Sequence, residues 1–195
     1  MTDSPPVSPE TRRNRRTLIL LVVLFFGAML AAGALRFSGW RPDGMKNKGE
    51  MLSPYGDLRA YSPTLVNGAA YRWDANPRTW RIVVVPRDCD AVRRVACTEL
   101  LGSLDKVWRL MGRHADRVHV LWAGAPPVSL VGLREVHLIR DDAGLRAGLT
   151  GLDASAGQGD AAWLVDPNGF VVLRYGPGFD PADLRSDLGR LLRIN

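Results

Sequence analysis

The sequence has few residues suited to metal binding or nucleophilic catalysis. Among its 195 residues are two cysteines and three histidines, and no internal repeat is visible. The glycine-containing stretch 157–160 is not followed by the Lys-Ser/Thr pair and helix that a phosphate-binding loop needs. Nothing like a nucleophile elbow or an oxyanion loop accompanies the serines, so a Ser-His-Asp hydrolase is not indicated.

A long hydrophobic run occurs only once, from Leu18 to Leu35, with four arginines between positions 12 and 16 directly before it. A helix of 18 residues is about 27 Å long, enough to cross most of a bilayer's hydrocarbon core. The positive-inside bias keeps the arginines in the cytoplasm and sends the rest of the chain across the membrane. The sequence therefore predicts a disordered cytoplasmic tail (1–16), a transmembrane helix in lipid (17–35) and a periplasmic C-terminal part, anchored in a bacterial inner membrane.

The same run has an alternative interpretation as a cleaved signal peptide. Ala32-Gly33-Ala34 has the small-x-small pattern of a processing site. We favour the anchor, because the run exceeds the ~7 to 15 apolar residues of a typical signal peptide.

The remainder has the length of one domain with a mild excess of basic residues. The chain's formal net charge is +6, and the charges beyond the hydrophobic run are interspersed, which does not indicate nucleic-acid binding. Residues 36–59 are rich in Gly, Pro and charge and predict a linker, so order should begin near Ala60.

Hydrophobic patterns and turn residues predict the elements of the domain 60–195. Asn67-Gly68 and Asp166-Pro167-Asn168-Gly169 indicate hairpin turns, the first at the start of an exposed ribbon. The run 80–85, mostly β-branched, predicts a central strand buried on both faces. The other expected elements are a helix from about Ala91 to Met111, strands at 117–122, 135–139, 161–165 and 170–175, a short helix at 141–149, and a last helix opened by Asp180.

This order of elements fits an α/β fold: a thioredoxin-like domain, with a central mixed sheet and helices on both faces, after one transmembrane helix. The sequence also resembles the Sco/SenC branch of the thioredoxin-like superfamily, in particular its small membrane-anchored members associated with cytochrome oxidase assembly. The resemblance rests on the segments 47–50, 80–86, 115–118, 163–169 and 174–177 and on the Asp180-Pro181 helix start.

The resemblance implies a copper site that this chain keeps only in part. The family holds copper with a Cys-x-x-x-Cys pair at the start of the long helix and a histidine before the final hairpin. Cys97 takes the place of the second cysteine, but Arg93 stands at the first position and Gln158 near that of the histidine. We expect no resident cofactor and weak copper binding at best, through Cys89 and Cys97, with Met51 or Met111 as further soft ligands.

The two cysteines leave two interpretations open. Eight residues apart on a continuous helix, they lie about 12 Å apart along the axis and cannot bond. In the first interpretation no bridge forms: Cys97 is a small buried residue on the apolar face of the helix, and Cys89 is a thiol that bonds to nothing. With Cys89 instead in a loop before the helix, it can fold back to form a bridge, which an oxidising periplasm favours.

The histidines indicate structural rather than catalytic roles. His114 follows the long helix, while His119 and His137 fall in predicted strands, at an edge or on the surface. The resemblance thus implies an accessory protein with a degenerate copper site, a binding module more than an enzyme, that contacts an oxidase subunit or a copper chaperone. The alternative is a thiol-disulfide oxidoreductase or copper-handling protein that uses Cys89 and Cys97.

Overall fold

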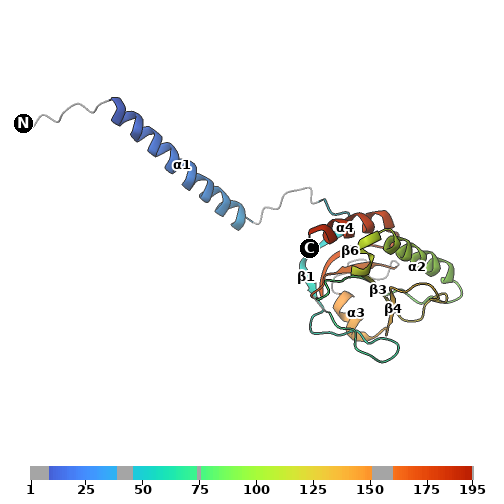
Figure 1. Cartoon of the computed structure of the whole chain (residues 1–195). Coiled ribbons are helices and arrows are strands. Elements are labelled where there is room, and N and C mark those ends of the chain that lie inside the picture. The colour runs from blue at the N-terminus through green and yellow to red at the C-terminus, as the bar shows by residue number, and fades with distance from the viewer. Residues whose placement is uncertain (1–8, 39–45, 74–75, 151–159, 195) are drawn as a thin grey trace, which may run out of the picture. The chain divides into compact units, whose positions relative to one another are not determined.

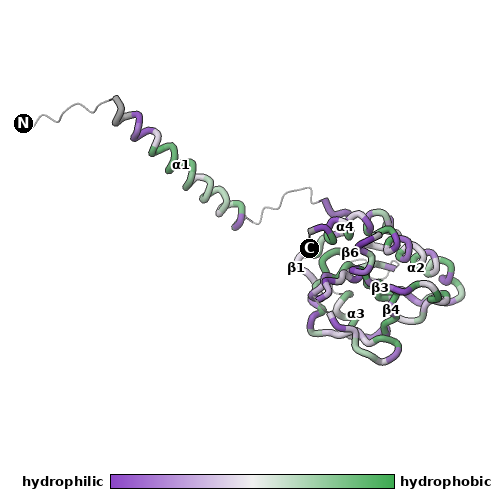
Figure 2. Tube along the Cα trace, viewed as in Figure 1, coloured by the Kyte–Doolittle hydropathy of each residue, from purple (hydrophilic) through white to green (hydrophobic). Residues whose placement is uncertain are grey.

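The computed structural model describes residues 9–38, 46–73, 76–150 and 160–194, and it divides into two compact units, 1–45 and 46–195 (Figure 1). The first unit contains helix α1 (Pro9–Phe37). Within the described residues, Arg13–Phe37 is the one stretch that is long and apolar enough to cross a membrane. Figure 2 shows this apolar stretch along α1.

The predicted tail and linker were both too long. Helix α1 begins at Pro9, inside the segment expected to be disordered, because arginine is a good helix former and extends a helix that has already nucleated. Order in the second unit begins before Ala60: strand β1 (Glu50–Asp57) lies within the predicted linker. Its pairing with a later strand, rather than any local apolar pattern, makes this segment a strand.

The second unit is built on one six-stranded mixed sheet with strand order β1-β6-β5-β2-β3-β4. Strand β2 pairs in parallel with β3, as does β3 with β4, whereas β5 pairs antiparallel with β2 and β6, and β6 with β1. The bounds are β2 (Trp80–Val84), β3 (Val118–Ala123), β4 (Val136–Ile139), β5 (Ala162–Val165) and β6 (Phe170–Tyr175). All five residues of β2 are buried, as the run of β-branched residues predicted.

Helices cover both faces of this sheet, which confirms the predicted fold class (Figure 1). Helices α2 (Arg94–Arg109) and α4 (Pro181–Ile194) pack together over one face, and α3 (Ala143–Thr150) packs on the other. A 3-10 helix, η1 (Gly112–Arg117), follows α2. The two hydrophobic clusters that result, one per face, form the core of the unit.

The two predicted turns fare differently. At Asp166-Pro167-Asn168-Gly169 the Asp166 Oδ1 atom accepts from the amides of Asn168 (2.9 Å) and Phe170 (2.7 Å), and β5 and β6 form the expected hairpin. At Asn67-Gly68 a turn forms, but only a single bridge joins Thr64 to Ala70. The expected ribbon is therefore absent there, and the first strand of the fold is β1.

A buried carboxylate joins the start of the second unit to its last helix. Asp187 of α4 is 2% exposed and accepts from the backbone amides of Lys48 (2.7 Å) and Gly49 (2.8 Å) and from the Tyr175 hydroxyl (2.9 Å). Burial and the neighbouring Asp187 raise the pKa of Tyr175, so the phenol stays protonated and donates. Any side chain at Gly49 would collide with the Tyr175 ring, because a Cβ atom would lie 2.6 Å from Cζ. The glycine is thus required by the close approach.

Replacing Asp187 by alanine is expected to lower the free energy of unfolding by about 3 kcal/mol, because three donors, two of them in buried hydrogen bonds, lose their acceptor. Urea unfolding of the chain in neutral detergent, followed by near-UV circular dichroism, measures this. The control Glu99→Ala, at an exposed position of α2, should change the value by less than about 0.5 kcal/mol. Equal midpoints for the two variants would contradict this role of Asp187.

Candidate functional site: a disulfide at the carboxyl edge of the sheet

The two cysteines meet where the central strand leaves the sheet. After β2 the chain passes Pro86 into a loop, and α2 begins at Arg94, three residues later than predicted. Cys89 therefore lies in the loop, Cys97 lies in the second turn of α2, and their Cα atoms are 6.0 Å apart. A disulfide joins them, so of the two interpretations left open by the sequence, the structure has the bridge.

The two sulfur atoms have different surroundings. Cys97 is fully buried in the cluster beneath α2, on the apolar face that the sequence predicted. Cys89 is partly exposed and lines a hollow of about 440 Å³. The loop after β2, the residues after β3 and Asp141 form this hollow. Only the Cys89 side of the bridge is thus open to a reacting partner.

One carboxylate holds both ends of the cysteine loop. Asp160, just before β5, accepts from the Arg87 backbone amide through Oδ1 (2.9 Å) and from the Arg93 guanidinium through Oδ2 (2.5 Å). Within the loop, Asp90 Oδ1 accepts from the amides of Val92 and Arg93, both at 3.0 Å. These bonds fix the loop that carries Cys89.

Arg93, at the position where the resemblance implied the first cysteine ligand, forms an ion pair with Asp160. The Asp160 side chain is 10% exposed and that of Arg93 30%. Gln158, at the position expected for a histidine ligand, lies outside the described residues. Within residues 9–38, 46–73, 76–150 and 160–194, no three His, Cys, Asp or Glu side chains gather as a metal site would require.

Two valines near Cys89 are exposed, which the sequence analysis missed, and three charged residues are exposed there as well: Arg87, Asp88 and Asp90. Val92, in the turn just before α2, is 86% exposed, and Val95, in the first turn of α2, is 68% exposed. The sequence signal for this apolar surface was the presence of two valines at exposed positions near the start of an otherwise regularly amphipathic helix. They give a partner protein apolar area to bury next to the bridge.

A second polar cluster lies at the opposite end of the parallel strands. His119 and His137, each the second residue of its strand, have ring centroids 4.4 Å apart. Arg81 donates through Nε to the Tyr71 hydroxyl oxygen (3.0 Å), which lies 2.7 Å from Nδ1 of His119. Because a guanidinium only donates, the Tyr71 O–H is free to donate to a neutral His119.

Both histidines are half-buried. His137 lies in the edge strand β4, as predicted, whereas His119 lies in the interior strand β3, so its predicted place at an edge or on the surface was wrong. The loop that carries Tyr71 and Trp73 packs against them. Burial, together with the neighbouring His137 and Arg81, lowers the pKa of His119 to about 4, and burial lowers that of His137. His114, by contrast, lies in η1 after the long helix, as predicted.

The fold and the bridged cysteine pair define a thioredoxin-like protein. Residues 80–195 match the family described as "Transmembrane-like, thioredoxin-like, C-terminal domain", and the chain belongs to this family. No curated protein is significantly similar to it in sequence.

Solved structures with this fold are distant in sequence. Copper-bound Sco1 of yeast is 12% identical, with a TM-score of 0.50, over 78% of this chain and 96% of that one. Copper-bound ScoI of Bradyrhizobium japonicum is 18% identical, with a TM-score of 0.44, over 66% and 95%. Peroxiredoxin Q of Xanthomonas campestris is 16% identical, with a TM-score of 0.41, over 76% and 97%. At these identities the likeness concerns the fold alone.

The histidine pair predicts a pH-dependent stability. His119 is neutral in the folded chain down to pH about 4 but takes up a proton near pH 6.5 when unfolded. The free energy of unfolding is therefore expected to fall as the pH is lowered from about 6.5 to about 4. In His119→Asn part of this slope should disappear, whereas His114→Asn should keep it. Identical slopes in all three chains would show that His119 does not contribute.

Proposed function

We propose that this chain is a membrane-tethered protein of thiol-disulfide exchange, with Cys89 as the reacting sulfur and Cys97 as its buried partner. The observation that carries the proposal is the disulfide between a partly exposed loop cysteine and a fully buried helix cysteine at the carboxyl edge of the sheet. Ligands of open α/β sheets bind outside the carboxyl ends of the strands, so this edge is a natural reaction site.

The exchange proceeds in two balanced steps with a protein that carries a cysteine pair. A thiolate of that protein attacks Cys89 Sγ, a mixed disulfide forms, and Cys97 leaves as a thiolate. The partner's second thiolate then attacks the partner's first sulfur, which is bonded to Cys89 in the mixed disulfide, and Cys89 leaves as a thiolate. The partner dithiol is oxidised to a disulfide, the chain's disulfide is reduced, and its two thiolates take up the two protons that the partner releases.

The start of α2 favours a thiolate at Cys97, although burial of this residue disfavours the charged form. Cys97 lies near the N-terminus of α2, where the helix dipole favours negative charge, and Arg93 and Arg94 stand just before it. The exposed Val92 and Val95 offer the partner an apolar contact beside Cys89. An orientation with α1 in a bacterial inner membrane and the second unit in the periplasm supplies the oxidising compartment that such a pair needs.

The unequal exposure of the two sulfurs predicts unequal reactivity. In the full chain in neutral detergent, Cys97→Ser leaves Cys89 free and should form a mixed disulfide with oxidised glutathione. Cys89→Ser leaves only the buried Cys97 and should react at least about tenfold more slowly. Intact-mass spectrometry over time gives both rates.

A purely structural disulfide, which only restrains the loop, would have a different reduction potential. Such structural disulfides have reduction potentials below about −300 mV, and we expect a more oxidising value for the wild-type pair because Cys89 is accessible. Titration against glutathione and dithiothreitol buffers measures the potential. A value below about −300 mV, or equal reaction of the two serine variants, would reject the exchange proposal.

A second candidate function is that of an accessory factor in cytochrome c oxidase assembly, which acts by contact with an oxidase subunit or a copper chaperone. The replacement of the expected copper ligands favours it. Arg93 brings a positive charge, paired with Asp160, to the place where the resemblance implied a thiolate. A cation next to this guanidinium is repelled, so in this function the chain holds copper weakly at best.

The double variant Cys89→Ser/Cys97→Ser separates the two candidate functions. Contact alone needs neither sulfur, so cells with this variant are expected to keep wild-type amounts of assembled oxidase, measured from haem spectra of their membranes. Cells without the chain should lose assembled oxidase. Loss in the double variant, at an equal amount of protein in the membrane, would exclude action by contact alone.

A further inference from the structure

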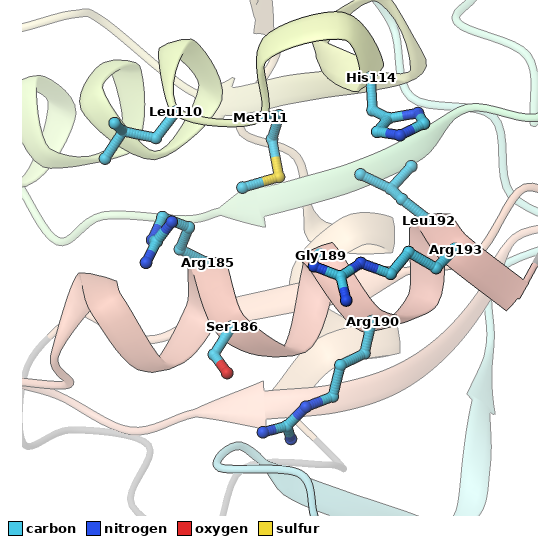
Figure 3. Close-up of a pocket in the computed structure, with 9 residues that line it drawn as sticks. All are labelled: Leu110, Met111, His114, Arg185, Ser186, Gly189, Arg190, Leu192 and Arg193. Atoms are coloured by element: carbon cyan, nitrogen blue, oxygen red, sulfur yellow. The ribbon is translucent and has the colours of Figure 1, made fainter.

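Far from the cysteines in sequence, a groove separates the end of α2 and η1 from α4. It has a volume of about 320 Å³, and three arginines of α4 line it (Figure 3): Arg185, Arg190 and Arg193. Among the described lining residues there is no carboxylate. Met111 and the buried Leu192 supply apolar surface. The groove thus combines concentrated positive charge with apolar surface.

The placement of two arginines creates this charge. Arg185, Gly189 and Arg193 follow one another at four-residue spacing, so they share one row of α4. Figure 3 shows Arg185 and Arg193 on the side of α4 near Met111, with Arg193 reaching back toward Gly189, while Arg190 points away. Within the described part of the chain, neither Arg185 nor Arg193 has a carboxylate partner. Their charge is available to a ligand.

The helix itself explains only part of this arrangement. Arg193 lies in the last turn of α4, where a cation is favoured by the helix dipole, but Arg185 lies in the first half. Glycine inside a helix costs about 1 kcal/mol relative to alanine. A Cβ atom at Gly189 would meet nothing within 4 Å, so close packing does not require the glycine. Its absent side chain leaves the space between the two arginines open.

We propose that this groove binds a phosphate group, presented by the headgroup of an anionic phospholipid. Guanidinium groups match phosphate oxygens with paired hydrogen bonds, and the flanking apolar side chains suit the glycerol and acyl parts of a lipid. A free phosphate ion would make the same polar contacts and leave the apolar surface unused.

With α1 in a membrane, as in the proposed function, the short linker limits how far the second unit can lie from the lipid surface. Arg190 donates through Nη1 to the Lys46 carbonyl oxygen, so the residue where the second unit begins lies against α4, the helix that carries the groove's arginines. Eight residues separate Phe37, the end of α1, from Lys46, and the nine Cα–Cα steps between these two residues span at most about 32 Å. Juxtamembrane basic residues near an anionic surface each gain about 1 kcal/mol, which favours the lipid over the free ion.

Full-length chain in lipid nanodiscs tests the proposal through the arginine Nε–Hε resonances, assigned by their loss in single variants. Replacing neutral phosphatidylcholine in part by phosphatidylglycerol should shift the Arg185 and Arg193 resonances. Inorganic phosphate titrated into neutral nanodiscs at constant ionic strength should shift the same resonances saturably. In Arg185→Gln/Arg193→Gln the phosphate dissociation constant, followed on the Arg190 resonance, should rise at least about tenfold.

Matched variants separate the groove from net charge and from misfolding. Arg134→Gln/Arg140→Gln removes two exposed charges beside β4 and should bind phosphate like the wild type. Gly189→Glu places a carboxylate in the open space and should abolish binding, whereas Gly189→Ala should retain it. Near-UV circular dichroism checks that each variant is folded.

Each result decides the matter. A response to phosphatidylglycerol supports the lipid headgroup, and saturation by phosphate without that response overturns the lipid as the source while leaving the groove as a phosphate site. No saturable response to either probe would overturn the proposal. So would an equal loss of binding in the Arg134/Arg140 pair.

Discussion

The burial of β2 on both faces is the constraint on which the rest of the second unit depends. Its five residues lie between β3 and β5, so both its backbone edges are hydrogen-bonded and both its faces need cover. The one charged residue, Arg81, is 2% exposed and donates to the Tyr71 hydroxyl and to the carbonyls of Thr79 and Pro167. A charge can stay at the centre of the sheet because those acceptors surround it.

The same constraint positions the cysteine pair. Because β2 is hydrogen-bonded to a neighbour on each side, the chain leaves the sheet only where β2 ends. Pro86, which has no backbone N–H, prevents the hydrogen-bond ladder from continuing. The loop that follows is closed by Asp160, which stands at the entry to β5, the neighbour of β2. The loop with Cys89 is therefore tied to the sheet at both ends. The bridge and the Asp160 contacts together restrain this loop.

The sequence predicted elements whose signal is local and missed those whose signal is not. The β-branched run of β2 and the turn from Asp166 to Gly169 are each determined by residues within the segment itself. Strand β1 contains Pro54 and Gly56 and lacks β-branched residues, and it forms because β6 offers it a partner. The cysteine bridge depended on whether α2 begins at residue 91 or 94, a difference within the uncertainty of any helix boundary read from sequence.

Asp187 explains how the arginines of α4 divide their roles. Arg190 lies 3.3 Å from its Oδ1 and also donates to Lys46, so it helps to hold the first residue of the second unit against α4. Its remaining donors are constrained by that geometry. Arg185 and Arg193 lie one turn before and one turn after Gly189. Among the described contacts, neither pairs with a carboxylate. A ligand in the groove can therefore engage these two guanidiniums without loosening the junction that Asp187 and Arg190 maintain.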